Sequence, residues 1–352
     1  MAKHTPRSSD QLASEHAQIA QDLQEGRLDN AELALSALLA RHPRLAFAHY
    51  QMGRCHRARG NLPAAIAAYR RAIALAPELA AAYTSLGNAL RANGQLAEAI
   101  EAQTRAALLQ PRLPQAHFNL GNALFASGQP AAAARAYSQA LSLQPGWDKA
   151  RRGMLIAQAA TYLHDGRWTD AELAHRRLVA EFPDSPPLWI GLGIAAWQLG
   201  QPVDARQAFE QAWQLDPEDG AACAHVATLL NQQSLWAEAL PWHERVQARL
   251  PGDPVLLTEQ ASALMFCARY EDALDCLEQA LAIDPGHSPA AYHRAFVRLM
   301  LGDYARGYTD FELRFTPGFV YPDGRPPFAM PPWQGEDPVS YTHLTLPTNR
   351  EV

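Results

Sequence analysis

Hydrophobic and polar positions recur along the chain with a period of 34 residues. Prolines mark this period, at positions 43, 77, 111, 145, 183, 217, 251 and 285. The interval from Pro145 to Pro183 alone is longer, at 38 residues. Twelve residues before each proline stands an alanine, and Gly307 continues that series. A fixed period of this length predicts an array of repeated supersecondary units.

Each period predicts two antiparallel helices. The small residue in each unit lets the helix backbones approach, where a larger side chain would overpack the contact. A turn residue stands five positions earlier, and it is glycine in seven units and Ser234 or Ala268 in the other two. Glycine tolerates the positive φ of a tight turn, and the proline ends the second helix. One unit can bury its apolar residues only against its neighbours. The pattern therefore predicts an all-α solenoid of about nine helix pairs over residues 12–315.

Two irregularities divide this array further. Residues 1–11 precede the repeats and are expected to be flexible, and the first unit, residues 12–45, is polar enough to cap the array. The longer interval adds four residues near 146–152. One added helical turn is about 6 Å long, so we expect a break in register there, with four units before it and five after it.

The repeating columns resemble the tetratricopeptide repeat (TPR) family. This resemblance implies a right-handed α–α superhelix whose first helices line a concave, peptide-binding groove. Asparagine can both donate and accept hydrogen bonds, so asparagines in that groove can pair with a peptide backbone, and arginines beside them favour acidic or carboxylate groups. The alternative is a solvated polar face. The groove candidates are Arg54, Arg57, Asn88, Arg91, Asn119, Asn122, Trp197, His225 and Asn231, with Ser85, Thr228 and His293 as further polar positions.

Composition and motifs exclude several classes of function. The net charge of −6 lacks the basic excess of a nucleic-acid binder. No signal peptide or membrane-length apolar run is present, which predicts a cytoplasmic protein without a membrane partner. The four cysteines form no CxxC pair and are expected to be buried, reduced thiols. We find no catalytic, nucleotide or metal motif, so no cofactor is expected, and His175, Phe209 and His243 are interpreted as packing residues.

The end of the array carries a more specific pattern. Residues 301–315 read LGDYARGYTDFELRF and residues 332–335 read PWQG. This junction resembles bacterial proteins in which a TPR array precedes a glycosyltransferase-like domain related to the O-linked N-acetylglucosamine transferases. The resemblance implies a partner-recognition arm of a nucleotide-sugar-dependent enzyme, joined by a proline-rich linker at 316–339.

Residues 340–352 have no counterpart in that family. We interpret them as a non-native tail, with the catalytic domain missing from this chain, which therefore transfers no sugar itself. The alternative is a stand-alone TPR adaptor with no associated enzyme. The sequence predicts protein or peptide partners but neither their identity nor the oligomeric state.

Overall fold

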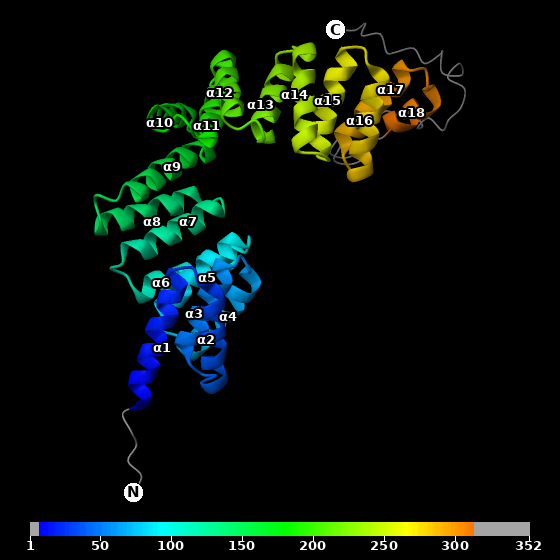
Figure 1. Ribbon diagram of the computed structural model, residues 1–352. Coiled ribbons are helices and arrows are strands. Elements are labelled where there is room, and N and C mark those ends of the chain that lie inside the picture. Colours follow the sequence, from blue (N-terminus) through cyan, green and yellow to red (C-terminus); the bar gives the residue numbers. More distant parts are fainter. Residues whose placement is uncertain (1–6, 313–352) are drawn as a thin grey trace, which may run out of the picture. The chain divides into compact units, whose positions relative to one another are not determined.

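A computed structural model describes residues 7–312, and all regular secondary structure in that range is helical (Figure 1). The helices group into two compact units, Met1–Ala174 (unit 1) and His175–Val352 (unit 2). Ala174 and His175 are neighbours within α10, Trp168–Glu181. The expected linker at 316–339 and tail at 340–352 lie outside the described residues.

Unit 1 is built from successive helix pairs joined by short turns. Its helices are α1 (Arg7–Gln24), α2 (Leu28–Arg41), α3 (Ala46–Ala58), α4 (Leu62–Leu75), α5 (Ala80–Ala92), α6 (Leu96–Leu109), α7 (Pro114–Ala126), α8 (Pro130–Leu143) and α9 (Asp148–His164). We call the odd-numbered helices first helices and the even-numbered ones second helices. α1 begins at Arg7, before the expected boundary at residue 12. Once a helix has formed, each further residue adds one backbone hydrogen bond, so the helix can extend beyond the part that is packed.

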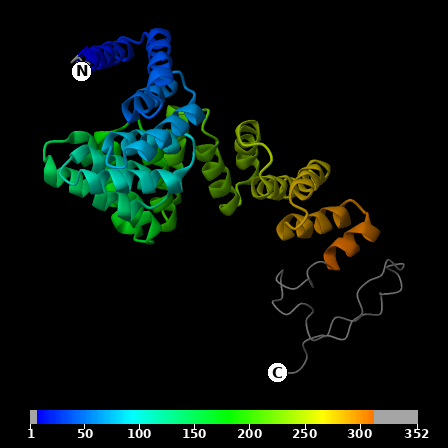
Figure 2. The ribbon, with the colours of Figure 1, turned by 90° about the horizontal axis from the view of Figure 1, so that it is seen from below.

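Unit 2 continues the same alternation of first and second helices after α10. Its helices are α11 (Pro186–Gln198), α12 (Pro202–Leu215), α13 (Gly220–Gln232), α14 (Trp236–Arg249), α15 (Pro254–Phe266), α16 (Tyr270–Ile283), α17 (Ser288–Met300) and α18 (Tyr304–Phe311). In Figure 2 the yellow and orange helices of this unit follow one another in sequence order. The eighteen helices of the described range confirm the predicted nine pairs.

The small-residue column is buried in every repeat. All eight alanines of the column are fully buried, and Gly307 is also buried. Each second helix from α2 to α16 ends two residues before its repeat proline. These observations confirm that the second helices end before the prolines, and the burial of the alanines agrees with the packing role predicted for them.

The turn between the two helices of a unit adopts the left-handed conformation. The seven turn glycines have φ between 69° and 82°, from Gly166 to Gly302. Ser234 (φ 60°) and Ala268 (φ 57°) adopt the same conformation without being glycine. Because a Cβ makes this conformation costly, these two turns carry local strain that the other seven lack.

The four extra residues of the long interval lengthen one helix. α9 has 17 residues, whereas the first helices α3, α5 and α7 have 13 each. Both α7 and α9 begin three residues after a repeat proline, so the extra residues lie within α9. The associated change in stacking angle stays a prediction.

In several repeats a side chain of the second helix packs into a gap left by a glycine of the first helix. A Cβ built on Gly121 would lie 2.6 Å from Cε1 of Tyr137, and one on Gly87 would lie 2.6 Å from Nε2 of Gln103. Gly53 stands in the same relation to Tyr69, at 2.5 Å. We call these second-helix residues gap residues. In unit 2 Phe209 fills the gap at Gly193, while His243 occupies the equivalent position one repeat later. His175, Phe209 and His243 are all buried, as predicted.

Some first helices also form a side-chain hydrogen bond to the carbonyl oxygen of the repeat proline that precedes them. Nε1 of Trp189 donates a 2.7 Å hydrogen bond to the carbonyl oxygen of Pro183. Rings at the equivalent position in unit 1 make the same contact at 2.9 Å, between Nε2 of His49 and Pro43 and between Nε2 of His117 and Pro111. These bonds satisfy carbonyls that the proline turn leaves without a helical partner.

Candidate functional site

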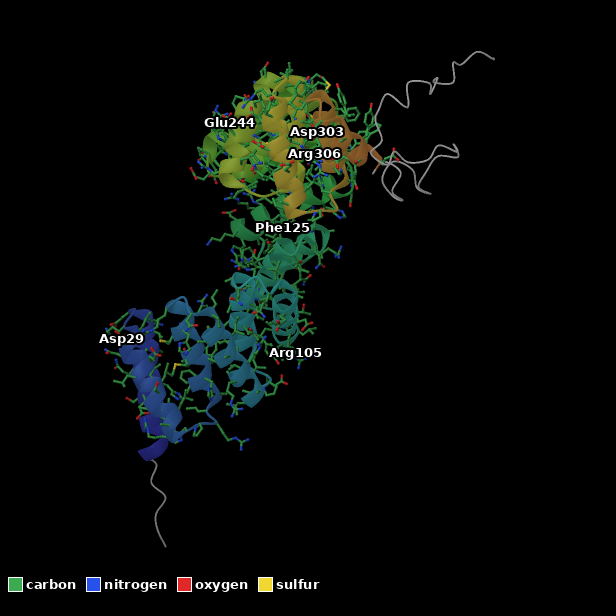
Figure 3. All side chains as sticks on the ribbon, turned by 90° about the vertical axis from the view of Figure 1, so that its right-hand side faces the viewer. Asp29, Arg105, Phe125, Glu244, Asp303 and Arg306 are labelled. Carbon is green, nitrogen blue, oxygen red and sulfur yellow. The ribbon has the colours of Figure 1, made fainter. Side chains whose placement is uncertain are left out.

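In each unit successive first helices contact one another and form a continuous surface, which we call the first-helix face. In unit 1 it is formed by α3, α5, α7 and α9. Three side-chain positions recur on α3, α5 and α7, one helical turn apart. They hold Gln51, Ser85 and Asn119; then Arg54, Asn88 and Asn122; then Arg57, Arg91 and Phe125. Phe125 is labelled in Figure 3 and is 38% exposed.

Asn88 and Asn122 lie at the middle position and are oriented from behind by gap residues. Nε2 of Gln103 donates to Oδ1 of Asn88 at 3.1 Å, and Oη of Tyr137 donates to Oδ1 of Asn122 at 2.8 Å. Burial raises the pKa of Tyr137 to about 12, so its hydroxyl keeps the proton that it donates. Within residues 7–312 neither Nδ2 group has a hydrogen-bond partner. Each asparagine therefore has its acceptor occupied and its donor available.

The other candidates in unit 1 differ in accessibility. Asn119 is only 7% exposed, and its Oδ1 accepts from Nε2 of Gln115 at 2.9 Å. Arg54 is half-buried and donates to Oε1 of Gln51 at 2.9 Å. Arg57 and Arg91 are exposed, and neither forms an ion pair with a described residue. The available groups of this face are therefore two amide donors and two exposed guanidinium groups.

Unit 2 arranges its three candidates differently. Nε1 of Trp197 donates to Oε1 of Gln232 at 3.0 Å, which joins α11 to α13. The ring of His225 stacks on Phe209 at a centroid distance of 4.8 Å, and burial lowers its pKa. The ring of His225 is therefore largely neutral at pH 7.

Asn231 uses its donor group inside the protein. Its Nδ2 donates to the carbonyl oxygen of Glu259 at 3.0 Å and lies 3.1 Å from Nε2 of His243. Its Oδ1 is buried and has no hydrogen-bond partner within residues 7–312. Asn231 is thus oriented oppositely to Asn88 and Asn122 and joins α13 to α15.

Several residues that shape these faces were missing from the sequence-based candidates. Gln103 and Tyr137 stand on second helices, so the polar pattern of the first helices does not indicate them. Glu259 was missed although the repeat offered a signal: it lies 34 residues after His225 and 34 before His293. Its carboxylate accepts a 2.5 Å hydrogen bond from Oγ1 of Thr228.

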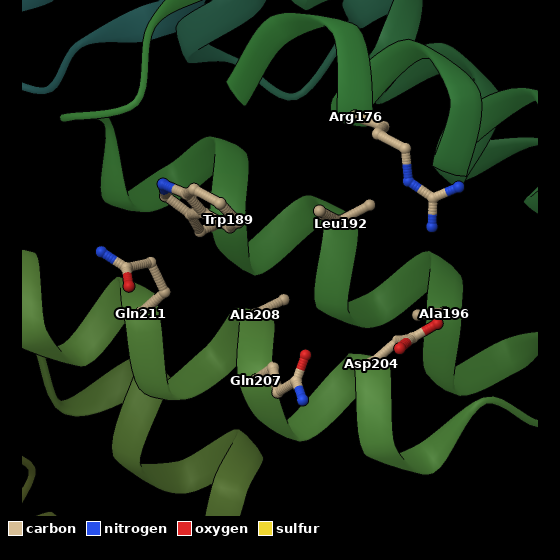
Figure 4. Close-up of a pocket in the computed structure, with 8 residues that line it drawn as sticks. All are labelled: Arg176, Trp189, Leu192, Ala196, Asp204, Gln207, Ala208 and Gln211. Carbon is tan, nitrogen blue, oxygen red and sulfur yellow. The ribbon is translucent and has the colours of Figure 1, made fainter. Parts of the chain in front are cut away.

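A pocket of about 310 Å³ lies away from the predicted candidates (Figure 4). It is lined by Arg176 of α10, by Trp189, Leu192 and Ala196 of α11, and by Asp204, Gln207, Ala208 and Gln211 of α12. All of these residues belong to unit 2.

The described residues show no other chemical centre. No three His, Cys, Asp or Glu side chains in this range are grouped to hold a metal ion. Cys55 and Cys223 are buried, whereas Cys267 and Cys276 are half-buried, and burial raises the pKa of Cys276 to about 11. No helix in this range has the length and apolar character needed to span a membrane.

Known protein families match both units of the chain. Models described as TPR or tetratricopeptide repeats match residues 53–94, 87–128, 114–147, 196–262 and 256–287. A curated relative, the CTR9 homolog of Arabidopsis thaliana, is 27% identical over 162 residues, which is 45% of this chain. The chain spans only 14% of that relative's length.

Two solved structures share the fold. A tetratricopeptide repeat protein from Parabacteroides merdae superposes with a TM-score of 0.52 at 15% identity, covering 72% of this chain and 98% of that one. The Cut9–Hcn1 hetero-tetramer of the APC/C superposes with a TM-score of 0.55 at 16% identity, covering 84% of this chain and 57% of that one. At these identities the likeness extends to the fold alone.

Proposed function

The chain belongs to the tetratricopeptide repeat family, and we propose that it is a protein-interaction scaffold whose unit 1 binds an extended peptide along its first-helix face. The observation that carries this proposal is the orientation of Asn88 and Asn122. Their Oδ1 atoms are held by Gln103 and Tyr137, so their Nδ2 groups are directed donors without a partner in the described range. A donor of this kind recognises a backbone carbonyl whatever side chain the peptide carries.

The general spacing of packed helices suits an extended ligand bound by both donors. Packed helices lie roughly 8–10 Å apart, and a polyproline II segment rises about 3.1 Å per residue with three residues per turn. A peptide in that conformation presents a carbonyl to the same side every third residue, about 9 Å along its axis. Asn88 and Asn122 on adjacent first helices would then each bind one of these carbonyls.

The charge of this face favours acidic peptides. The three recurring positions on α3, α5 and α7 hold Arg54, Arg57 and Arg91 and no carboxylate. Arg57 and Arg91 are exposed and lack an ion pair among the described residues. A peptide carboxylate would gain a charge-assisted hydrogen bond there, which is stronger than one between neutral groups.

The test is a binding comparison on the full chain. Fluorescently labelled protein is applied to an array of random ten-residue peptides, and the strongest acidic peptides are titrated by fluorescence anisotropy. Each neutral hydrogen bond contributes about 0.5–1.5 kcal/mol, so Asn88→Ala with Asn122→Ala should weaken binding about tenfold. Asn30→Ala, an exposed position on α2, is the control and should change nothing. Undiminished binding by the double variant, with helicity intact, would overturn the proposal.

The finer proposal concerns the enzyme to which this array would belong. The sequence pattern from Gly302 to Gly335 supports an arm of a glycosyltransferase-like protein. The structure describes only its beginning, where Oδ1 of Asp303 accepts from the backbone amide of Arg306 at the start of α18. The gene sequence beyond the codon for Pro338 tests it: a nucleotide-binding strand–turn–helix pattern supports the arm, and a stop codon supports the stand-alone adaptor.

A further inference from the structure

The first-helix face of unit 2 carries a carboxylate that has no cationic partner in the described chain. Oε2 of Glu259, on α15, accepts a hydrogen bond from Oγ1 of Thr228 on α13. No described residue donates to Oε1, and none forms an ion pair with the carboxylate. The side chain is half-buried, and this burial raises the pKa of Glu259 while the bond from Thr228 acts in the opposite direction.

Such a group is costly to the free protein. A carboxylate that is partly removed from water without a counter-charge destabilises the fold. Charged groups kept in that state are candidates for function, because a ligand of opposite charge removes the cost. The bonds from Thr228 to the side chain and from Asn231 to the backbone carbonyl of Glu259 hold this residue in place.

The surroundings of Glu259 supply no positive charge. The three recurring positions on α11, α13, α15 and α17 contain neither lysine nor arginine; they hold Gly191, Ile194, Trp197, His225, Thr228, Asn231, Glu259, Ser262, Met265, His293, Phe296 and Leu299. Burial lowers the pKa of both His225 and His293, so both rings are largely neutral at pH 7. The same positions in unit 1 hold three arginines and no acid.

We propose that this face is a second binding site, in which Glu259 receives an arginine or lysine side chain of an extended protein segment. The face also carries apolar surface, since Trp197 is half-buried on α11 and Phe296 is 38% exposed on α17. A metal ion fits poorly, because no three ligating side chains are grouped in the described range. The scaffold would then hold an acidic segment on unit 1 and a basic one on unit 2. This second site does not depend on the first.

The test uses the full chain and the same array of random ten-residue peptides. Arginine- or lysine-bearing peptides should be enriched over neutral ones. For the strongest arginine peptide, Glu259→Gln should raise Kd about tenfold or more, because a hydrogen bond to a charged group is lost. Replacing that arginine with citrulline should weaken binding similarly, and the two changes together should cost no more than either alone. Glu244→Gln, an exposed site on α14, makes the same charge change and should leave Kd unaltered (Figure 3).

Thermal unfolding separates a binding role from a structural one. Since Glu259→Gln removes an uncompensated charge, its Tm should equal or exceed that of the wild type. A clear fall in Tm would instead assign Glu259 a structural role and overturn the proposal. The proposal would also be overturned if Glu259→Gln bound the basic peptide as tightly as the wild type, or if basic peptides were not enriched on the array. The Asn88 and Asn122 double variant should still bind the basic peptide. A failure of the proposed unit 1 site can therefore be distinguished from a failure of this one.

Discussion

Oη of Tyr137 donates a 2.8 Å hydrogen bond to Oδ1 of Asn122, so a second-helix residue orients a residue of the first-helix face. Tyr137→Phe removes this donor and leaves the asparagine free to rotate. We expect a stability loss of about 0.5–1.5 kcal/mol and weaker binding of acidic peptides, measured by urea unfolding and anisotropy.

The equivalent residue two repeats earlier, Tyr69, is the control for that prediction. The hydroxyl of Tyr69 is buried and, unlike that of Tyr137, has no partner in hydrogen-bond geometry among the described residues. Tyr69→Phe should therefore leave stability unchanged or raise it, since an unsatisfied buried group is removed. Equal losses in both variants would show that the bond to Asn122 does not matter.

Gly121 is predicted to be intolerant of even one added methyl group. Its Cβ would lie 2.6 Å from the ring of Tyr137, which is buried and cannot easily withdraw. Gly121→Ala should lower the free energy of unfolding by about 1–3 kcal/mol through overpacking. Gly146→Ala is the matched control, because Gly146 has open space around it and no positive φ. Similar melting temperatures for the two variants would contradict the gap arrangement.

The column of small residues between paired helices makes a parallel prediction. Ala133 is fully buried at the contact between α7 and α8. Ala133→Leu should cost about 1–3 kcal/mol, because the larger side chain forces the helices apart. Thermal unfolding followed by circular dichroism measures this, and an unchanged transition would count against the column.

Ala268 offers the opposite case, a substitution that should stabilise the protein. Its φ is 57°, at the turn position that holds glycine in seven other repeats. The left-handed conformation costs a residue with Cβ about 1–2 kcal/mol, and glycine's greater freedom in the unfolded chain offsets part of that gain. Ala268→Gly should raise stability by about 0.5–1 kcal/mol. Gly200→Ala, at φ 71°, should lower it, and the same sign for both would refute the explanation.

His243 should make stability fall as the solution becomes acidic. Burial lowers the pKa of His243 from 6.5 to about 4. Between pH 6.5 and pH 4 this histidine is therefore protonated in the unfolded chain but neutral in the folded one. Stability then decreases as pH falls from about 6.5 to about 4, by roughly 2–3 kcal/mol for this group. His243→Phe introduces the residue found at the equivalent position of the preceding repeat, Phe209. This variant should show a smaller change of stability with pH in urea titrations at several pH values. An identical slope would show that His243 protonates as easily in the folded state.

The sequence predicts the helices well because their signals are local. Ala133 and the turn glycines are explained by steric fit within one unit, and both act as expected. The availability of polar groups is not local. Asn88 and Asn231 are the same residue type on equivalent helices, yet Gln103 occupies the acceptor of the first, while Glu259 and His243 take up the donor of the second. Those partners stand on other helices, so the polar pattern of one helix could not distinguish the two cases.

The gap left by Gly87 and Gly121 has a consequence for how such a scaffold could change its partners. Gln103 and Tyr137 donate to the Oδ1 atoms of Asn88 and Asn122 and so leave the Nδ2 groups available, although Gln103 is fully buried and Tyr137 nearly so. A substitution in the interior could therefore reverse the polarity of a contact while every exposed residue stays the same. Two proteins of this kind with identical outer surfaces could differ in what they recognise, and the difference would be inherited through residues that no partner touches.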